Sequence, residues 1–344
     1  MENLNPILEC VPNFSEGLDE DVIHAIANAI SQIPEQKLLH IDPSPAANRT
    51  VFTFAGKPDA VIAAAYNAIK TAAELIDMRQ QKGTHPRLGA TDVCPLIPLQ
   101  GMTMDEAVHW ANALARKVGN ELNIPVYLYE HSAKATYRRA LPDIRKGQYE
   151  GLQTKMALPE WQADYGPSTA TDWDSIAATG ATIIGARDIL VAFNISLDTK
   201  DEKIAKAIAE RMRSSGGGLL PALRAIGWYM ADFNCAQVSM NLLDYKTTSP
   251  LTIWETCRTL AAEYGVSVIG CEVVGLIPEA CVLEAGAKAL GVGLDGSAIY
   301  SLESGKDNKL IAAGVDYLGL DKVKPFVVEE KILERVMRRR GLLE

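Results

Sequence analysis

The order of hydrophobic patterns along the chain is the feature that most restricts its fold. Apolar residues either alternate with polar ones, as in half-buried strands, or recur at helical spacing, as on helices packed against a core. In the first half these patterns predict a strand, a helix, two strands, a helix and a strand, followed by one more helix and strand. The predicted elements are, in that order, 6–11, 19–33, 37–42, 49–55, 58–76, 91–99, 104–117 and 125–130.

The second half repeats this order. Its predicted elements are strand 188–197, helix 199–214, strands 223–232 and 236–245, helix 250–264 and strand 266–277. A split β-α-β-β-α-β unit is characteristic of the ferredoxin-like plait, so the patterns predict an α+β protein with two such units in tandem. We place the two subdomains at 1–180 and 181–344.

The segment 151–182 between the two patterns is rich in Gly, Pro, Ser and Thr and has no clean period. A run of about 30 irregular residues is unusual inside a compact protein. We interpret the segment either as a ligand-binding segment or as a solvated connector, and its residues alone favour neither.

The charge balance excludes several classes of function. The 344 residues carry 34 Lys and Arg against 43 Asp and Glu, a formal net charge of −9, without a cationic run long enough to follow a phosphate backbone. We therefore expect no nucleic-acid partner. No apolar run reaches the roughly 18 residues that cross a bilayer, and the first residues lack the cationic region of a secretory signal. We expect a cytoplasmic protein without membrane contact.

The sequence lacks the common metal and nucleotide motifs. The six cysteines are spread singly, without a CxxC pair, and several lie in apolar segments where a buried thiol is the ordinary interpretation. Neither the glycine-rich phosphate loop nor the dinucleotide fingerprint occurs. We expect no structural zinc, no disulfide and no catalytic metal.

The stretch "DMRQQKGTHPRLGATDVCP" at 77–95 differs from its surroundings. It places His85 in a glycine-containing loop with three cations, Arg79, Lys82 and Arg87, in an acidic protein. Neighbouring cations lower the pKa of an imidazole, which keeps it neutral and able to accept a proton, and they also attract carboxylates. The loop therefore predicts an acid-base site for a carboxylate-bearing substrate, with His85 as the base.

Two other stretches have a similar character. "VPNFSEG" follows the first predicted strand and offers Asn13, and "IDPSPAANRTVFTF" places Asp42 at the end of one predicted strand and Arg49 at the start of the next. Loops at strand ends commonly hold ligands. Each stretch by itself is equally well explained as a helix cap or a strand connection. Because all three stretches fall in the first predicted subdomain, together they favour a site at its strand ends.

Several stretches resemble one enzyme family. "ECVPNFSEG", "NRTVFTFAG", "LIDMRQQKGTHPRLGATDVCPLIP", "DYGPS", "AIGWYM" and "AQVSMNLLDY" are similar to glutamate formimidoyltransferase, the transferase part of formimidoyltransferase-cyclodeaminase. The resemblance covers nearly the whole chain, and the first and third stretches together are highly specific. It implies transfer of the formimidoyl group from N-formimidoyl-L-glutamate to N5 of tetrahydrofolate in histidine degradation, which gives 5-formimidoyltetrahydrofolate and L-glutamate.

The resemblance also implies a fold and site residues. It implies two ferredoxin-like subdomains with a folate-binding cleft between them, tetrahydrofolate as cosubstrate, and a homodimer, with any cyclodeaminase partner on a separate chain. The histidine of the "HPR" motif corresponds to His85, the catalytic base, and the aspartate at the preceding strand end corresponds to Asp42, its partner. Beyond residue 169 the sequence is longer than is usual in the family, so no folate contact is carried over there. The folate-binding segment corresponds to Asp164, Tyr165, Gly166, Pro167, Ser168 and Thr169.

The chemistry of the two substrates suggests the remaining roles. His85 would take the proton from N5 after attack on the formimidoyl carbon and give it to the departing glutamate nitrogen, with Asp42 orienting the imidazole. Arg49 and Arg87 would hold the glutamate carboxylates and Asn13 a polar group of the substrate. No metal is required for these steps.

Two alternatives stay open. The same fold would serve formyl exchange between 5-formyltetrahydrofolate and glutamate, because nothing in "KGTHPRLGA" distinguishes a carbonyl oxygen from an imine nitrogen. A pair of plaits would also serve as a folate- or amino-acid-binding module without turnover, since fold alone does not define function. In that case His85 would be dispensable.

Overall fold

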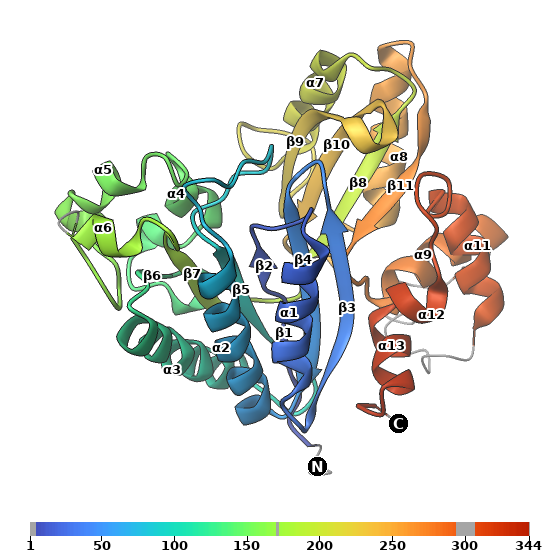
Figure 1. Ribbon diagram of the computed structural model, residues 1–344. Helices are drawn as coiled ribbons and strands as arrows, with labels where there is room; N and C mark the ends of the chain where they lie inside the picture. The colour runs from blue at the N-terminus through green and yellow to red at the C-terminus, as the bar shows by residue number, and fades with distance from the viewer. Residues whose placement is uncertain (1–4, 170–171, 294–306, 344) are drawn as a thin grey trace. The chain divides into compact units, whose positions relative to one another are not determined.

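The computed structural model describes residues 5–169, 172–293 and 307–343. The chain forms two compact units, Met1–Asp188 and Ile189–Glu344, each built on its own β-sheet (Figure 1). The boundary that the sequence suggested after residue 180 lies just before strand β7 (Thr182–Ala186). The first unit extends beyond that point because β7 pairs with two strands of the first sheet.

The first sheet has the strand order β3-β4-β1/β2-β5-β7-β6. The strands β1 and β2 lie in line between β4 and β5, and Pro12, which has no N–H to donate, stands where this extended stretch is interrupted. The strands β5, β7 and β6 are parallel to one another, whereas the other pairs are antiparallel. The remaining strands are β1 (Leu8–Cys10), β2 (Asn13–Phe14), β3 (Gln36–Ser44), β4 (Arg49–Gly56), β5 (Thr91–Pro98) and β6 (Val126–Leu128).

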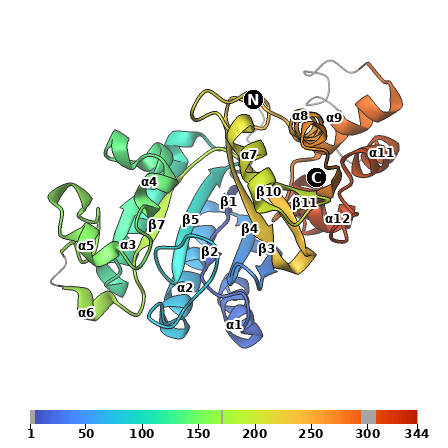
Figure 2. The same ribbon diagram turned by 90° about the horizontal axis from the view of Figure 1, so that it is seen from above.

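Three long helices cover one face of this sheet, and Figure 2 shows α1 and α2 running along the same side of it. Each helix begins at a local signal. Asp19 accepts hydrogen bonds at the start of α1, Pro58 is the first residue of α2, and Thr103 with Glu106 forms a capping box at the start of α3. Their buried faces pack on Phe52 and other apolar strand residues. The helices are α1 (Glu20–Ser31), α2 (Pro58–Leu75) and α3 (Met104–Leu122).

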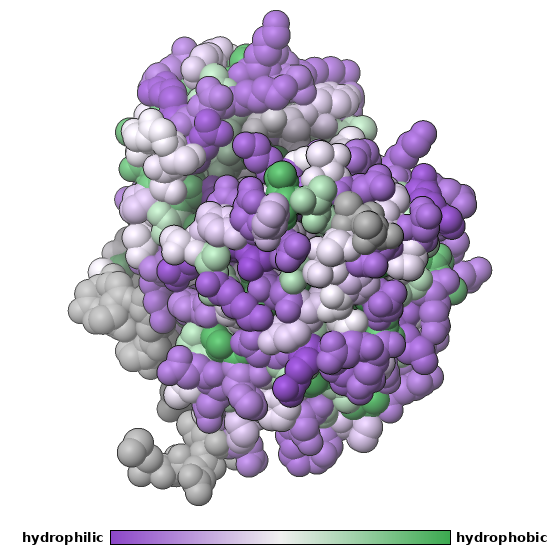
Figure 3. Space-filling view, turned by 90° about the vertical axis from the view of Figure 1, so that its left-hand side faces the viewer, coloured by the Kyte–Doolittle hydropathy of each residue, from purple (hydrophilic) through white to green (hydrophobic). Residues whose placement is uncertain are grey.

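The segment 151–182 folds onto the first unit. It contains α5 (Leu152–Met156), α6 (Trp173–Ile176) and the first residue of β7, and α4 (Leu141–Arg145) precedes it. Apolar side chains of α5 and α6 are buried with strand residues in a small separate core. On the face of the molecule that carries α3, α5 and α6, polar residues predominate (Figure 3). The segment is therefore not a solvated connector.

The second sheet has the order β11-β8-β10-β9, with every pair antiparallel. Its elements follow one another as β8-α7-β9-β10-α8-β11. Phe193 and Ile195 of β8 are buried in the main core of this unit, so the alternating Asn194 and Ser196 point to the other face. The elements are β8 (Val191–Leu197), α7 (Glu202–Met212), β9 (Leu223–Met230), β10 (Cys235–Leu242), α8 (Pro250–Glu263) and β11 (Val268–Val274).

Further helices follow the second sheet. Gly286 of α9 and Gly314 of α11 let these two helices approach closely, because a Cβ at either position would lie about 2 Å from a carbonyl oxygen of the other helix. None of the helices within 5–169, 172–293 and 307–343 is long and apolar enough to cross a membrane. The helices are α9 (Glu279–Leu290), α11 (Asn308–Leu318), α12 (Val328–Lys331) and α13 (Leu333–Arg339).

Candidate active site

Charged residues gather at one edge of the first sheet, where β2 ends and β4 and β5 begin. Asn13 of β2 lies between Val51 of β4 and Val93 of β5. Arg49, the first residue of β4, donates from Nε to Oδ1 of Asn13 at 3.0 Å and from Nη1 to Oδ2 of Asp92 at 2.5 Å. The guanidinium of Arg49 is therefore held by side chains from the two neighbouring strands.

Asp92 is placed at this edge by a β-bulge. Asn13 is paired with Val93, but the next residue, Phe14, is paired with Thr91, so that Asp92 is the extra residue of β5. A bulge re-aims the side chain of the extra residue and is common beside active sites. A regular strand would have given Asp92 a partner on β2 and another direction.

The carboxylate of Asp92 is fully buried and joins two guanidinium groups. It accepts from Nη1 of Arg49, from Nη2 of Arg145 at 2.5 Å and from the backbone N–H of Leu88 at 2.9 Å. Burial alone would raise the pKa of Asp92, but the charges of Arg145 and Arg49 lower it to about 2. The three side chains form a cluster with two positive charges and one negative charge.

The loop that carries His85 is held against the connection between β3 and β4. Asn48 accepts from the backbone N–H of Gly17 at 2.9 Å and donates to the carbonyl oxygen of Lys82 at 2.8 Å. The side chain of Gln81 donates to the carbonyl oxygen of Asn48 at 3.1 Å. These bonds connect three segments that lie far apart in the sequence, so the position of the loop depends on all of them.

His85 is half-buried in this loop, and its protonation state follows from its neighbours. Burial and then the charges of Arg49 and Arg145 lower the pKa of His85 to about 3, against a smaller raising effect from Asp92. The ring nitrogen Nδ1 lies 2.8 Å from the carbonyl oxygen of Pro86. A carbonyl oxygen can only accept, so Nδ1 carries the proton and Nε2 is left as the proton acceptor. His85 is thus a neutral base near two fixed cations.

The other histidines are placed differently. His24 and His109 are exposed on α1 and α3. Nε2 of His131 lies 3.2 Å from the carboxylate of Asp188. Within the residues that the structure describes, none of these three contacts Arg49, Asp92 or Arg145, whereas the charges of all three residues act on His85.

Asp42, the residue expected to orient His85, is buried near the end of β3. Its carboxylate lies 3.6 Å from Nε2 of His40. The carboxylate whose charge raises the pKa of His85 belongs to Asp92. A direct pairing of Asp42 with His85 stays a prediction.

Arg87, expected to hold a substrate carboxylate, is buried and already engaged. Its two terminal nitrogens donate to the carboxylate of Glu150 at 2.9 and 2.7 Å, and its Nε donates to Oε1 of Gln81 at 2.7 Å. The side chain of Glu150 is 63% exposed. A substrate carboxylate would reach Arg87 only by replacing Glu150, which can swing into solvent.

The segment expected to bind folate begins with residues that have clear structural roles. Asp164 is almost fully buried, accepts from the backbone N–H of Leu128 at 2.8 Å and pairs with Arg138 at 3.0 Å. Tyr165 bridges to Val126 at the start of β6. The side chain of Asp164 is therefore occupied within the protein, and its part in folate binding stays a prediction.

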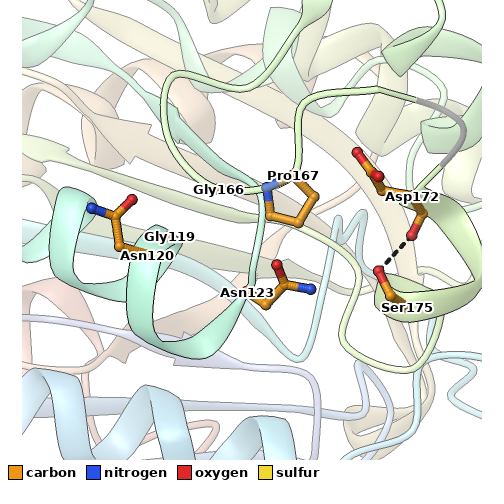
Figure 4. Close-up of a pocket in the computed structure, with 7 residues that line it drawn as sticks. All are labelled: Gly119, Asn120, Asn123, Gly166, Pro167, Asp172 and Ser175. Carbon is orange, nitrogen blue, oxygen red and sulfur yellow. Dashed lines mark hydrogen bonds between the residues drawn. The ribbon is translucent and has the colours of Figure 1, made fainter.

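Gly166 and Pro167 line a shallow pocket of about 390 Å³ beside the end of α3 (Figure 4). Gly166 has φ +76°, and a Cβ there would lie 2.4 Å from the carbonyl oxygen of Ile124, so the backbone requires glycine. Figure 4 shows Asn123 and Asp172 at the same pocket.

Thr169 donates to Oδ2 of Asp172 at 3.0 Å, and Ser168 is half-buried. The pocket and the cluster of Arg49, Asp92 and Arg145 lie at the same edge of the sheet. The strands β5, β7 and β6 are parallel, and both sites lie where these strands begin.

Asp92 and Arg145 were not predicted as site residues. Asp92 lies in the predicted strand 91–99, where its place beside "PRLGAT" was the available signal, and Arg145 lies in the stretch "LPDIRKGQYEGL", with no predicted element at its position. Neither stretch indicates that the two side chains meet. Within the residues that the structure describes, no group of three or more His, Cys, Asp or Glu side chains is arranged to hold a metal ion.

The chain matches two adjacent family descriptions. Residues 7–187 match the formiminotransferase domain, N-terminal subdomain, and residues 192–338 match the formiminotransferase domain. Together the two matches cover almost the entire chain, and the gap between them lies at the boundary of the two compact units.

Characterised relatives agree with these matches. A glutamate formimidoyltransferase from Thermoplasma acidophilum is 41% identical over 81% of this chain and 90% of its own length, and one from Streptococcus pyogenes is 41% identical over 81% and 91%. The formimidoyltransferase-cyclodeaminase of Rattus norvegicus is 44% identical over 96% of this chain. The chain spans 60% of the length of that rat protein.

Proposed function

Because the chain belongs to the formiminotransferase family, we propose that it transfers the formimidoyl group of N-formimidoyl-L-glutamate to N5 of tetrahydrofolate, giving 5-formimidoyltetrahydrofolate and L-glutamate. The observation that carries the proposal is the neutral His85, whose Nδ1 carries the ring proton and which lies near the largely buried Arg49 and Arg145. Relatives that match this chain over 90% of their own length are named for this reaction.

The reaction requires one proton to change places. N5 of tetrahydrofolate attacks the formimidoyl carbon, and a bond from N5 to this carbon forms in a tetrahedral adduct. The proton on N5 passes to Nε2 of His85 and then to the nitrogen of glutamate, whose bond to the carbon breaks. A positioned general base contributes about 10² to 10⁴-fold to such a step. Alignment of the two substrates contributes much of the remaining acceleration.

We assign Asp42 the role of balancing the charge of His85 when the imidazole is protonated. Its burial near the end of β3, close in sequence to the connection that anchors the His85 loop, supports this role. The charge of Asp92 raises the pKa of His85, so Asp92 also stabilises the protonated imidazole. Asn13, which orients Arg49, would also bind a polar group of the substrate.

We assign the glutamate carboxylates to Arg49 and Arg87. Arg49 lies beside His85 and Asp92, which favours a carboxylate near the reacting nitrogen. Arg87 would take the second carboxylate in exchange for Glu150, since the exposed Glu150 occupies the same two nitrogens with the same kind of group.

We propose that tetrahydrofolate binds along Asp164, Tyr165, Gly166, Pro167, Ser168 and Thr169 as the cosubstrate, without a metal. The pocket at Gly166 and Pro167 and its position on the same sheet edge as His85 support this assignment. The strand order of each sheet is compatible with a ferredoxin-like subdomain, and we propose this fold for both units. From the family resemblance alone we also propose a cytoplasmic homodimer.

The test is turnover by the purified protein with tetrahydrofolate and N-formimidoyl-L-glutamate, and separately with L-glutamate and 5-formyltetrahydrofolate. We expect turnover with the formimidoyl donor. His85→Ala should lose at least about 100-fold in kcat while its affinity for tetrahydrofolate changes little, because only the base is removed. The control is His109→Ala, which removes an exposed histidine of α3.

Each other result points to a different conclusion. Turnover only with 5-formyltetrahydrofolate and L-glutamate would show that the reaction is formyl exchange and not formimidoyl transfer. Tight folate binding without any turnover would indicate a binding module. Full activity of His85→Ala would refute the assignment of the base.

A further inference from the structure

We propose that Arg145 is a substrate-binding residue and that it and Arg49 together receive the α-carboxylate of the formimidoyl donor beside His85. This inference rests on the proposed function and names the group that the cluster binds. It adds Arg145 to the site and commits the two arginines to one of the two carboxylates of the donor.

The charges of the cluster do not balance. Among the residues that the structure describes, Asp92 is the one carboxylate bonded to Arg49 and Arg145, so one positive charge is left over in a largely buried place. The side chain of Arg49 is 8% exposed and that of Arg145 is 13% exposed. A second anion stabilises a partly desolvated cation more than it stabilises a cation in water. The cluster is therefore suited to bind a single carboxylate.

The donors for such a carboxylate are present. Arg49 uses Nε for Asn13 and Nη1 for Asp92, and Arg145 uses Nε and Nη2 for Asp92. In the part of the chain that the structure describes, Nη2 of Arg49 and Nη1 of Arg145 carry no hydrogen bond. Neither atom is completely shielded from solvent, so a ligand can reach both. Each arginine thus keeps one N–H group for a ligand while Asp92 holds its plane in position.

The structure of the donor selects the α-carboxylate. In N-formimidoyl-L-glutamate the α-carboxylate is attached to the carbon that carries the formimidoyl nitrogen, whereas the γ-carboxylate lies two further carbons along the chain. A carboxylate held beside His85 brings the reacting carbon close to Nε2 only if it is the α-carboxylate. The γ-carboxylate then extends away from the cluster, toward Arg87.

Binding of this carboxylate also changes His85. Burial and then the charges of Arg49 and Arg145 lower its pKa to about 3 in the free protein, where it is a weak base. A bound carboxylate offsets the surplus positive charge but not the effect of burial, so the pKa of His85 rises and the base becomes stronger. The donor itself would thereby activate the base that its reaction needs.

The test compares two donors on variants of Arg145. The second donor, N-formimidoyl-4-aminobutyrate, lacks only the α-carboxylate. In the wild type its kcat/KM should be about 10 to 100-fold lower, the size expected for a charge-assisted hydrogen bond. Arg145→Gln should raise KM for the complete donor by a similar factor, leave KM for tetrahydrofolate within about two-fold, and show a much smaller difference between the two donors. Arg145→Lys should recover part of the loss because it keeps the charge.

Arg139→Gln is the matched control, because Arg139 is exposed, lies in the same segment and makes no side-chain hydrogen bond or ion pair with the residues that the structure describes. Its kinetics with both donors should equal those of the wild type. Urea unfolding of each variant shows whether the fold is kept. If Arg145→Gln slows both donors by the same factor, Arg145 does not bind the α-carboxylate and the inference is wrong.

Binding of L-glutamate, measured by calorimetry, separates this inference from the proposed function. L-glutamate carries the same α-carboxylate and needs no turnover. If the wild type shows no transfer but binds L-glutamate, and Arg145→Gln binds it at least about 10-fold more weakly, the carboxylate site stands and the proposed reaction falls. If the wild type turns over the donor and Arg145→Gln binds L-glutamate as tightly as the wild type does, the proposed reaction is supported and the proposed carboxylate site is refuted.

Discussion

The protonation state of His85 depends on residues that come from other parts of the chain. Arg49 begins β4 and Arg145 ends α4, and the charges of both lower the pKa of His85. The cations next to it in the sequence act elsewhere, since Arg79 pairs with Asp77 and Arg87 with Glu150. The sequence pattern predicted that Arg79, Lys82 and Arg87 lower the pKa of His85, whereas in the structure burial and then the charges of Arg49 and Arg145 do so.

A first prediction concerns the stability of the protein between pH 5 and pH 7.5. The pKa of His85 is about 3 in the folded protein and 6.5 ordinarily, so below pH 6.5 the unfolded chain binds a proton that the folded protein does not. Stability therefore falls as the pH falls through this window, and by pH 5 the His85 contribution reaches up to about 2 kcal/mol. His85→Asn cannot take up this proton and should lose less stability than the wild type.

Urea unfolding at the two pH values measures this difference. The carboxyl group of Asp92, whose pKa is lowered to about 2, stabilises the fold above about pH 4 and loses this contribution only below it, so it adds no pH dependence between pH 5 and pH 7.5. His24→Asn serves as a control for the loss of an exposed histidine. Equal pH dependence of wild type and His85→Asn would show that His85 is not held neutral by its surroundings.

A second prediction concerns the shared carboxylate of the cluster. Asp92→Asn removes the negative charge and leaves Arg49 and Arg145 buried without it, so the variant should lose about 3 to 5 kcal/mol of stability. Asp198→Asn changes an exposed aspartate whose side chain bonds to none of the described residues, and it should change stability by less than about 0.5 kcal/mol. Urea unfolding at pH 7 measures both, and a similar small effect for both variants would contradict the central role of Asp92.

At the scale of elements, the site is built from features that interrupt regular structure. The bulge of β5 places Asp92, and the loop at 77–90 is held by hydrogen bonds to the β3–β4 connection. The segment 164–169 crosses the end of α3, where Gly119 and Gly166 allow the two backbones to approach. Each of these features joins segments that no local pattern connects.

A third prediction tests the turn at Gly166. Gly166→Ala adds a Cβ at φ +76° and 2.4 Å from a carbonyl oxygen, so the variant should lose at least about 2 kcal/mol of stability and raise KM for tetrahydrofolate. Gly147→Ala is the matched control in the same unit, since its φ is +91° but its nearest neighbour lies at 3.6 Å. It should lose only about 1 kcal/mol and keep its KM. Equal effects of the two changes would mean that the close approach at Gly166 is not important.

At the scale of the whole molecule, the extent of the first unit depends on β7. This strand lies between β5 and β6 in the first sheet, and α3 packs against it. In the described sheet β6 has no other strand as a partner. Any division of the chain before β7 therefore separates β6 from the rest of its sheet.

A fourth prediction follows for fragments of the chain. The fragment 1–188 keeps β7 and should unfold cooperatively in urea, whereas 1–180 lacks it and should lose cooperativity or unfold at a clearly lower urea concentration. Circular dichroism and tryptophan fluorescence should give coincident transitions only for 1–188. A fragment 1–190, which adds two residues without another strand, should behave like 1–188. Equal transitions for 1–180 and 1–188 would contradict the role of β7.

The sequence by itself predicted most elements, and it is the basis on which His85 is proposed as the base. Alternation and helical spacing are local properties, so they predicted the strands around Arg49 and Thr91, the long helices and the loop of His85. The resemblance in short motifs was sufficient to identify the family. Strand β7 was missed because its few residues follow an irregular segment and its partners lie far away in the chain.

The tertiary structure decided which charges meet. The bulge that re-aims Asp92, the arrival of Arg145 from α4 and the capture of Arg87 by Glu150 all depend on pairs of side chains separated by more than 40 residues. An ion pair of this kind leaves no period in the sequence, because either partner is an ordinary charged residue in its own segment. Only the packed fold brings these charges close enough, and excludes enough water, to set the pKa of His85.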